Sequence, residues 1–274
     1  MFRFCSLASG SRGNAAIVQA EGCTVLIDLG ISYSKLSARL EALSISPQAL
    51  NAVLITHAHS DHVQGLEMLM KKQTVPVYMK EHTYDVLVRK RGYNIPREGI
   101  TFIDQDHLHV GPFAIQVFRL PHQGWLESGA DDPGAHVGFK FTCQNKTLGF
   151  FTDLGRMPDE VYPHIHDCDY YVLEANHDVL WQKMSKRPQG VIERNLKSFG
   201  HLSNHQAGEI LTKILRPRRA DRRTKGVMLA HLSRDCNNPI IAEDTILKAF
   251  TLNGVDPVEI SYAPPERASC VVVI

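Results

Sequence analysis

The sequence predicts an α/β fold in which two sheets are covered by helices and a functional site lies along one sheet edge. Three observations support this prediction. Short apolar runs typical of strands mix with helix-like segments along the whole chain. Several of these runs end in polar residues, and connecting loops often carry function. No linker-like or low-complexity segment divides the chain, so we expect a single domain over residues 1–274.

The first half of the chain combines strand-like runs with amphipathic segments. Leu36, Leu40 and Leu43 recur at helical spacing and predict a helix over 32–43. The run AVLIT is short and apolar, as a buried strand requires. The strands expected here are 3–8, 15–20, 23–28 and 52–56, and a second helix is expected over 63–72.

Alternating apolar residues predict half-buried strands in the second half. Phe113, Ile115 and Val117 point to one side of an extended chain, and residues 137–141 repeat the pattern. Further strands are expected over 147–153, 170–178, 227–230 and 270–274, and helices over 188–198, 204–215 and 243–252.

The composition disfavours several classes of protein. With 30 basic and 29 acidic residues the formal net charge is +1, which disfavours a broadly cationic nucleic-acid coat but allows a nuclease with a local basic groove. The start of the chain lacks a secretory signal, and no run approaches the ~18 apolar residues that cross a bilayer. Six scattered cysteines without a C-x-x-C pair favour reduced thiols. We therefore expect a cytoplasmic protein that does not enter a membrane, and the oligomeric state stays open.

The segment THAHSDH concentrates three imidazoles and a carboxylate directly after a predicted buried strand. Zinc and manganese prefer such ligands. On an extended strand end, His57 and His59 point to the same side and can reach one ion. A turn at Ser60 then starts a helix and presents Asp61 and His62 toward a second position. The alternative is a polar helix cap with the histidines in solvent, which three histidines at this spacing disfavour.

The histidines outside this segment are expected to be structural or solvated. His164, His166 and Asp167 look like a second metal motif, but without further ligands nearby we expect a helix end or loop with a structural role. The others expected to face solvent are His82, His107, His109, His136 and His205.

The H-x-H-x-D-H element resembles the diagnostic motif of the metallo-β-lactamase superfamily. The resemblance implies a four-layer αββα sandwich made of two ββα halves, with further ligands at successive strand ends. It also implies two divalent ions, zinc or manganese, of which His57, His59 and His122 would hold the first. The second ion would be held by Asp61, His62 and His231, Asp153 would join both ions, and Asp28 would be the early structural aspartate.

Two ions ~3.5–4 Å apart can share a water, lower its pKa and stabilise both the attacking and the leaving oxygen. Asp61, at the second ion, is therefore counted with the catalytic residues as well as with the ligands. The superfamily applies this chemistry to lactams, thioesters, lactones, sulfates and phosphodiesters. Asp153 and the lack of a signal disfavour a secreted antibiotic-degrading enzyme, whereas glyoxalase-type thioesterases carry the same aspartate.

Three further motifs favour phosphodiesters. They are LEANHD at 173–178, GHLSNHQAG at 200–208 and AHLS at 230–233, and the first two are similar to elements of the transfer-RNA 3′-processing branch. Together with LASGSRGN at 7–14 they resemble the bacterial YycJ (WalJ/VicX) family, which implies a 5′→3′ exonuclease acting on DNA. The alternatives are an RNA-processing nuclease, a small-molecule esterase or lactonase, and a non-enzymatic regulator. The sequence lacks a long glycine- and proline-rich arm for transfer RNA, and the complete ligand set disfavours a regulator.

Phosphodiester chemistry assigns roles to residues of these motifs. His201 can protonate a leaving oxygen, and Glu174 can orient it. Ser203 or Asn204 would cap the following helix and leave its amide groups for a phosphate. Backbone donors of the glycine-containing turn at 9–14 can also bind an anion, although a simple β-turn explains its glycines equally well. The residues expected to contact substrate are Ser9, Ser11, Asn14, His177, Ser203 and Asn204.

A basic run, RPRRADRRTK at 216–225, places six basic residues in ten positions. Such runs are usually solvated loops. The alternative is a contact with the DNA backbone through Arg218, Arg219, Arg222 and Arg223.

Overall fold

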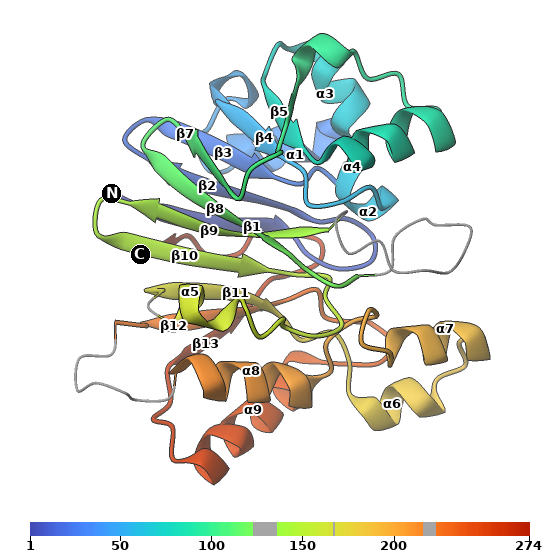
Figure 1. The fold of residues 1–274 in the computed structure, drawn as a ribbon, viewed down its shortest axis with the longest axis vertical. Helices are drawn as coiled ribbons and strands as arrows, with labels where there is room; N and C mark the ends of the chain where they lie inside the picture. The colour runs from blue at the N-terminus through green and yellow to red at the C-terminus, as the bar shows by residue number, and fades with distance from the viewer. Residues whose placement is uncertain (123–135, 167, 216–222) are drawn as a thin grey trace.

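Two seven-stranded sheets pack face to face, and helices cover the outer face of each, which gives four layers in the order αββα (Figure 1). This computed structural model describes residues 1–122, 136–166, 168–215 and 223–274. Three apolar clusters fill the spaces between the layers. The central cluster includes Phe4, Phe139 and Val172, and the other two lie between each sheet and its own helices. The predicted sandwich is confirmed.

The first sheet takes its strands from the N-terminal part of the chain and from its last residues. Its order is β14-β1-β2-β3-β4-β5-β6. Neighbours from β14 to β3 pair antiparallel, and those from β3 to β6 pair parallel. The strands are β1 (Arg3–Ala8), β2 (Ala15–Ala20), β3 (Cys23–Ile27), β4 (Ala52–Leu54), β5 (Val77–Met79), β6 (Ile100–Phe102) and β14 (Val272–Val273).

The second sheet repeats this plan in the order β13-β12-β11-β10-β9-β8-β7. Neighbours from β7 to β10 pair antiparallel, and those from β10 to β13 pair parallel. The strands are β7 (His107–Val110), β8 (Phe113–Arg119), β9 (Val137–Cys143), β10 (Lys146–Phe151), β11 (Tyr170–Glu174), β12 (Gly226–Ala230) and β13 (Glu259–Tyr262).

The helices begin at residues whose side chains satisfy free backbone groups. Ser32, Asp178 and Asn238 each accept a hydrogen bond from the backbone N–H three residues ahead. The helices are α1 (Tyr33–Glu41), α2 (Ser60–Val63), α3 (Leu66–Lys72), α4 (Glu81–Asp85), α5 (Tyr162–Ile165), α6 (Val179–Met184), α7 (Gln189–Asn195), α8 (Asn204–Leu215) and α9 (Pro239–Asn253). A π-helical turn at Val86–Lys90 and 3₁₀ turns at Pro47–Ala49 and Arg97–Gly99 complete the set for the described residues.

The carboxyl ends of the parallel strands carry the polar residues, and α2 lies at this edge (Figure 1). Asp28 directly follows β3, and Asp153 follows β10 after one residue. Both aspartates have a left-handed φ of 57°. This left-handed conformation, which residues with a Cβ rarely adopt, turns the chain sharply out of the strand at both points.

Several elements differ in length from their predictions. The strand predicted over 23–28 ends at Ile27, because the backbone turns at Asp28. The strand predicted over 52–56 ends at Leu54, since the Thr56 N–H donates to the Asp28 carboxylate instead of to a strand. The segment predicted as one helix over 63–72 contains the end of α2 and then α3, which break where Gly65 approaches the backbone of residue 31. The helix predicted over 188–198 ends at Asn195, and the strand predicted over 270–274 spans two residues.

In the ranges that the structure describes, no helix is both long and apolar enough to cross a membrane. All six cysteines are unpaired, as their spacing predicts. Five of these thiols are buried, and Cys270 is exposed.

Candidate metal centre

Three histidines, contributed by both sheets, converge at the shared edge. His57 and His59 follow β4, and His122 follows β8. Nδ1 of His59 lies 2.9 Å from Nε2 of His57 and 3.2 Å from Nε2 of His122. One nitrogen from each of the three rings lies within 4.8 Å of the others, so all three can reach one ion.

A second triad lies beside the first and consists of Asp61, His62 and His231. Oδ2 of Asp61 is 3.6 Å from Nε2 of His62 and 3.7 Å from Nε2 of His231. Asp61 and His62 belong to the short helix α2, whereas His231 follows β12 in the other sheet. Both triads therefore join the two sheets.

Asp153 lies between the triads and is almost completely buried. Its Oδ2 is 3.4 Å from Nε2 of His62, and its Oδ1 is 3.2 Å from Nδ1 of His231. Among the described residues, Asp153 Oδ2 and His231 Nε2 are buried without a hydrogen-bond partner. Unpaired buried polar atoms are costly, and imidazole with carboxylate is a donor set for borderline divalent cations. The seven predicted ligands therefore fit two such ions.

The electrostatics of the two triads differ in the chain without ions. Burial lowers the pKa of His59 and of His122 to about 3, so both rings stay neutral and keep a lone pair for coordination. Burial also lowers the pKa of His231, but the carboxylates around it outweigh this effect and raise the pKa to about 10. The carboxylates around the second triad thus favour the protonated, positively charged form of His231.

A layer of hydrogen bonds fixes the orientation of the ligand histidines. Asp28 accepts from Nδ1–H of His62 at 2.7 Å and from the Thr56 N–H at 2.8 Å, so Nε2 of His62 faces the cluster. Nδ1–H of His122 donates to the Gly200 carbonyl at 3.0 Å, which turns its Nε2 inward in the same way. Asp28, the aspartate expected to be structural, thus holds His62 and the backbone of Thr56.

Glu174 holds two histidines at once. It ends β11 and is fully buried. Its Oε1 accepts from Nδ1 of His201 and from Nδ1 of His231, both at 2.8 Å. Its Oε2 accepts from the backbone N–H groups of Leu154 and Leu202 at 3.0 and 3.1 Å. Both oxygens are used in this way, which suits the expected role of Glu174 in orienting His201, and its place among the catalytic residues stays a prediction.

His201 lies at the open side of the cluster. Its ring centroid is 5.0 Å from that of His122 and 5.0 Å from that of His231. The side chain is 16% exposed, and with Nδ1 held by Glu174 its Nε2 is available to a bound molecule. This is the arrangement that a proton donor beside a metal centre requires.

Two residues of the N-terminal turn that is expected to contact substrate also contact histidines of the second triad. The buried Ser9 hydroxyl accepts from the His231 N–H at 2.7 Å. The Asn14 amide nitrogen lies 2.9 Å from Nε2 of His62, and its oxygen accepts from the Gly10 N–H at 2.8 Å. Ser11 is exposed on the same turn. Substrate contact by these residues stays a prediction.

The second group of expected substrate residues surrounds the start of α8. The Ser203 hydroxyl accepts from the Gln206 N–H at 3.3 Å, as a cap does. Asn204 exchanges two hydrogen bonds with Asn237, at 2.9 and 2.8 Å, and the structure does not bring its side chain into the cluster. His177 is buried, burial lowers its pKa to about 4, and neither ring nitrogen has a partner within the described residues.

His136 corrects a prediction, because it is 1% exposed and does not face solvent. Its ring centroid lies 4.6 Å from that of His57, and Nε2–H donates to the Thr152 carbonyl at 2.7 Å. β9 runs antiparallel to β8 and β10, so it starts at the edge where those strands end. Only this strand topology places His136 at the site, and the alternation of apolar residues in the sequence does not show the topology. His107, His109 and His205 are exposed as expected, and His82 is partly buried.

The other two clusters noted in the sequence lie apart from the metal centre or outside the described residues. His164 is exposed at α5 and His166 is partly buried just after it, while Asp167 lies outside the described residues. Of the basic run, residues 216–222 lie outside the described residues. Arg223 is described, and its guanidinium is 3.2 Å from Asp169 and bonds the Asn145 carbonyl. This residue therefore has structural partners.

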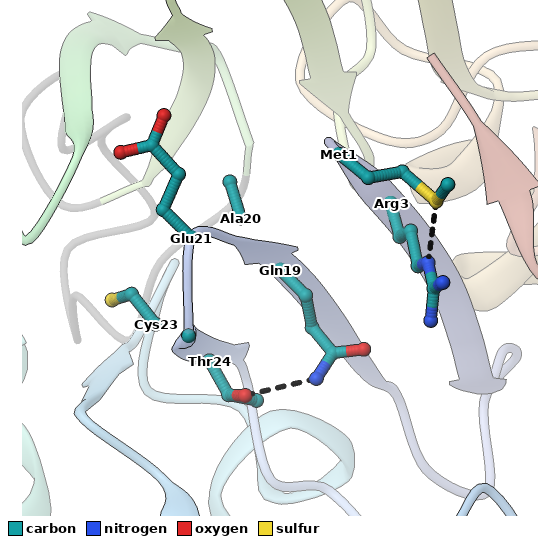
Figure 2. A pocket seen from close by; sticks show the side chains of 8 residues that line it. Met1, Arg3, Gln19, Ala20, Glu21, Cys23 and Thr24 are labelled. Atoms are coloured by element: carbon teal, nitrogen blue, oxygen red, sulfur yellow. Dashed lines mark hydrogen bonds between the residues drawn. The ribbon is translucent and has the colours of Figure 1, made fainter.

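A hollow of about 370 Å³ lies at the opposite end of β1, β2 and β3 (Figure 2). Gln19 donates to the Thr24 hydroxyl at 2.9 Å there, and Arg3 contacts the Met1 sulfur at 3.0 Å. Its polar groups thus contact one another, and the full length of the strands separates them from the metal centre. The candidate site remains the cluster of histidines and aspartates.

Comparison with known proteins agrees with this fold. Residues 24–220 match the family described as a beta-lactamase superfamily domain. Exodeoxyribonuclease WalJ of Streptococcus pneumoniae serotype 2 is 28% identical over 90% of this chain and 87% of its own length. Exodeoxyribonuclease YycJ of Bacillus anthracis is 29% identical over 92% of this chain and 90% of its own. The crystal structure of YhfI, a metallo-beta-lactamase fold protein from Bacillus subtilis, superposes with a TM-score of 0.66 at 18% identity and covers 98% of this chain and 99% of its own.

The fold and the ligand cluster define a metal-dependent hydrolase. The family match extends over most of the chain, and it includes the H-x-H-x-D-H segment, His122, Asp153 and His201. This chain belongs to the β-lactamase superfamily, and it is similar over nearly its full length to exodeoxyribonucleases.

Proposed function

We propose that this chain is a DNA exonuclease that hydrolyses phosphodiester bonds with two divalent ions, zinc or manganese, and digests from the 5′ end. The observation that carries the proposal is the His201–Glu174 pair beside seven metal ligands. The similarity to exodeoxyribonucleases over about nine-tenths of the chain supports DNA as the substrate. The 5′ polarity rests on the resemblance to the YycJ family.

We assign the ligands to the two ions by the two triads described above. His57, His59 and His122 would hold one ion, and Asp61, His62 and His231 the other, with Asp153 between. When bound, divalent ions lower the pKa of water and stabilise negative charge on phosphate oxygens.

The remaining step is proton delivery, and the chain supplies it. Water attacks phosphorus, the bond from phosphorus to the leaving sugar oxygen breaks, and that oxygen needs a proton. Glu174 binds Nδ1–H of His201, so the proton on Nε2 is the one aimed outward. A general acid in this position typically accelerates such a step by ~10²–10⁴-fold.

Digestion of end-labelled DNA tests the proposal. With the metal-loaded protein, a 5′ label should be released first as a mononucleotide, while a 3′-labelled strand should shorten progressively. Cleavage of RNA but not of DNA would instead assign the RNA-processing alternative. Hydrolysis of carboxylic esters or lactones alone would assign a small-molecule enzyme and contradict the proposal.

We also place the protein in the cytoplasm. Six unpaired cysteines, five of them buried, suit a reducing compartment. Fractionation of cells that produce the protein would test this, and recovery from an oxidising compartment would contradict it.

A further inference from the structure

Helices α6 and α7 with their connections, residues 179–199, form what we call the α6–α7 lobe. Figure 1 shows the lobe projecting beside the sandwich, on the side where α2 lies. Helices α8 and α9 pack on the second sheet through buried apolar residues, including Leu211 and Ile246. By contrast, the lobe presents large apolar side chains to solvent.

Three such side chains gather on the six residues of α6. Leu180 is 66% exposed, Trp181 is 42% exposed and Met184 is 82% exposed. Leu180 and Met184 are four residues apart and therefore share one helix face, with Trp181 adjacent. Large exposed apolar side chains that lie together commonly mark a binding surface.

The lobe is also strongly basic, although the whole chain is nearly neutral. It contains five basic residues and one acidic residue, Glu193. Lys183, Lys186 and Arg194 are exposed, and no described residue forms an ion pair with them. The others are Arg187, which bonds Ser233 and Asp235, and Lys197, which lies over the Phe199 ring.

The lobe begins just after His177, an expected substrate residue, and ends at the segment that carries His201. At its start, Asp178 caps α6 directly after His177. At its end, the Asn195 carbonyl accepts from the His201 N–H at 3.2 Å. The carbonyl of Gly200, the residue before His201, accepts the hydrogen bond from Nδ1–H of the predicted ligand His122. The lobe is therefore continuous with the segment that carries His201.

We propose that the α6–α7 lobe is a binding surface for a single DNA strand, with Trp181 stacking on a base and Lys183, Lys186 and Arg194 contacting phosphates. Exposed aromatic groups combined with cationic ones are the usual means of binding single strands without regard to sequence. A second copy of the chain suits the lobe less well, since a symmetric contact would bring like charges together. The inference rests on the proposed nuclease function and adds where its substrate binds.

Binding of a fluorescein-labelled single-stranded oligodeoxynucleotide, made cleavage-resistant by phosphorothioate linkages, tests the stacking contact. In the metal-loaded protein, Trp181→Ala should weaken binding about 5- to 100-fold, as loss of one base-stacking contact does. The matched control is Tyr262→Ala, which removes an aromatic side chain 49% exposed on β13 and should bind as wild type. Thermal melting and metal content must match wild type in both variants. Wild-type affinity in Trp181→Ala would overturn the proposal.

The dependence on salt tests the phosphate contacts. The triple variant Lys183→Glu, Lys186→Glu, Arg194→Glu should lower the slope of log affinity against log salt by about 2, at ~0.7 per contact. The control triple variant Arg3→Glu, Lys72→Glu, Lys213→Glu changes the net charge equally at exposed positions outside the lobe and should keep the wild-type slope. Equal loss in both variants would mean that only net charge matters and would overturn the assignment.

Fluorescence separates stacking from charge. Trp125, the other tryptophan, lies outside the described residues, and Trp125→Phe leaves Trp181 as the reporter. The oligonucleotide should quench this emission, whereas an abasic sugar–phosphate chain should bind with little quenching. Equal quenching by both would contradict stacking.

Three further outcomes separate the possible failures. If wild type degrades DNA while every lobe variant binds like wild type, only the lobe assignment fails. If wild type neither degrades nor binds DNA, the proposed function fails with it. A wild-type dimer that Trp181→Ala converts to a monomer, with DNA affinity unchanged, would show that a second copy occupies the lobe.

Discussion

At the scale of single residues, three strand-end positions have backbone conformations that side chains usually avoid. Asp28, Asp153 and His231 have φ values of 57°, 57° and 54°. Each such residue costs about 1–3 kcal/mol unless its surroundings impose it. At His231 the Ser9 hydroxyl holds the N–H and the Asn176 amide holds the carbonyl. The turn out of the strand directs each side chain into the shared edge.

Asp153→Asn should abolish hydrolysis and remove at least one of two ions per chain. Asparagine tolerates a left-handed φ, so the fold should persist while the anionic ligand is lost. Metal analysis and DNA digestion measure both effects. The control Asp159→Asn, at an exposed position, should retain metal and activity. Full activity in Asp153→Asn would contradict the two-metal mechanism.

His201→Ala should lower DNA turnover ~10²–10⁴-fold and leave the metal content at the wild-type level. A nitrophenyl phosphodiester has a better leaving group and needs less protonation, so the variant should be less impaired on it. His205→Ala, at an exposed position on α8, is the control. Equal impairment on both substrates would make His201 a phosphate-positioning residue, and metal loss would make it a ligand.

The sequence identifies site residues where chemistry is local and misses them where it is not. Residues 57–62 lie within one short segment, so their clustering is visible without a structure. His136 lies beside His57 because β9 runs antiparallel to β8, and no local sequence pattern shows the direction of a strand. The amide pair of Asn204 with Asn237 joins two helix starts far apart in sequence. The capping motif alone therefore did not indicate that the Asn204 side chain pairs with Asn237, and its contact with substrate stays a prediction.

At the scale of elements, the sequence Asp-Leu-Gly occurs at two equivalent places, after β3 and after β10. A Cβ on Gly30 would lie 1.6 Å from the Asp61 carbonyl oxygen. A Cβ on Gly155 would lie 2.3 Å from the Ser198 carbonyl carbon. Each glycine thus lets a site segment pack against the turn: the histidine loop in one half and the approach to His201 in the other.

Gly30→Ala should destabilise the protein by at least about 3 kcal/mol, because the added carbon meets backbone that cannot move without displacing α2. Urea unfolding measures the change. Gly190→Ala is the matched control, since no atom lies within 4 Å of its added carbon and a helical alanine is favoured by about 0.5–1 kcal/mol. Equal stability of Gly30→Ala and wild type would refute the close packing.

Elements with a visible period were predictable, whereas the short strands β5 and β6 were not. The alternation in β8 and β9 and the apolar face of α8 identify these elements within one or two residues. β5 and β6 have three residues each, too few to show a period. They exist because neighbouring strands and α3 bury them, which is a tertiary effect.

At the scale of the whole molecule, the ligands belong to both sheets. Four come from the segment after β4, and His122, Asp153 and His231 come from the second sheet. Ions bound at these positions would link the two halves and would stabilise only the folded chain.

Removal of the ions should therefore lower Tm. Ions present at 1,000 times their Kd contribute about 4 kcal/mol each, which corresponds to a decrease on the order of 10 °C for a chain of this size. Differential scanning calorimetry with and without chelator measures it, and metal return should restore the transition. The Asp153→Asn variant should show a smaller chelator effect. An unchanged Tm in protein verified as metal-free would contradict the linking role.

The pairing of β14 with β1 has a consequence for synthesis. Val273 lies opposite Arg3, and the Ile274 N–H donates to the Phe2 carbonyl at 3.0 Å. The ribosome delivers β1 long before β14, so the outer edge of β1 stays uncovered until residues 272–273 have been translated. An open strand edge is a template for pairing with other chains. A nascent chain halted shortly before residue 272 would thus already contain every metal ligand and still be prone to aggregate.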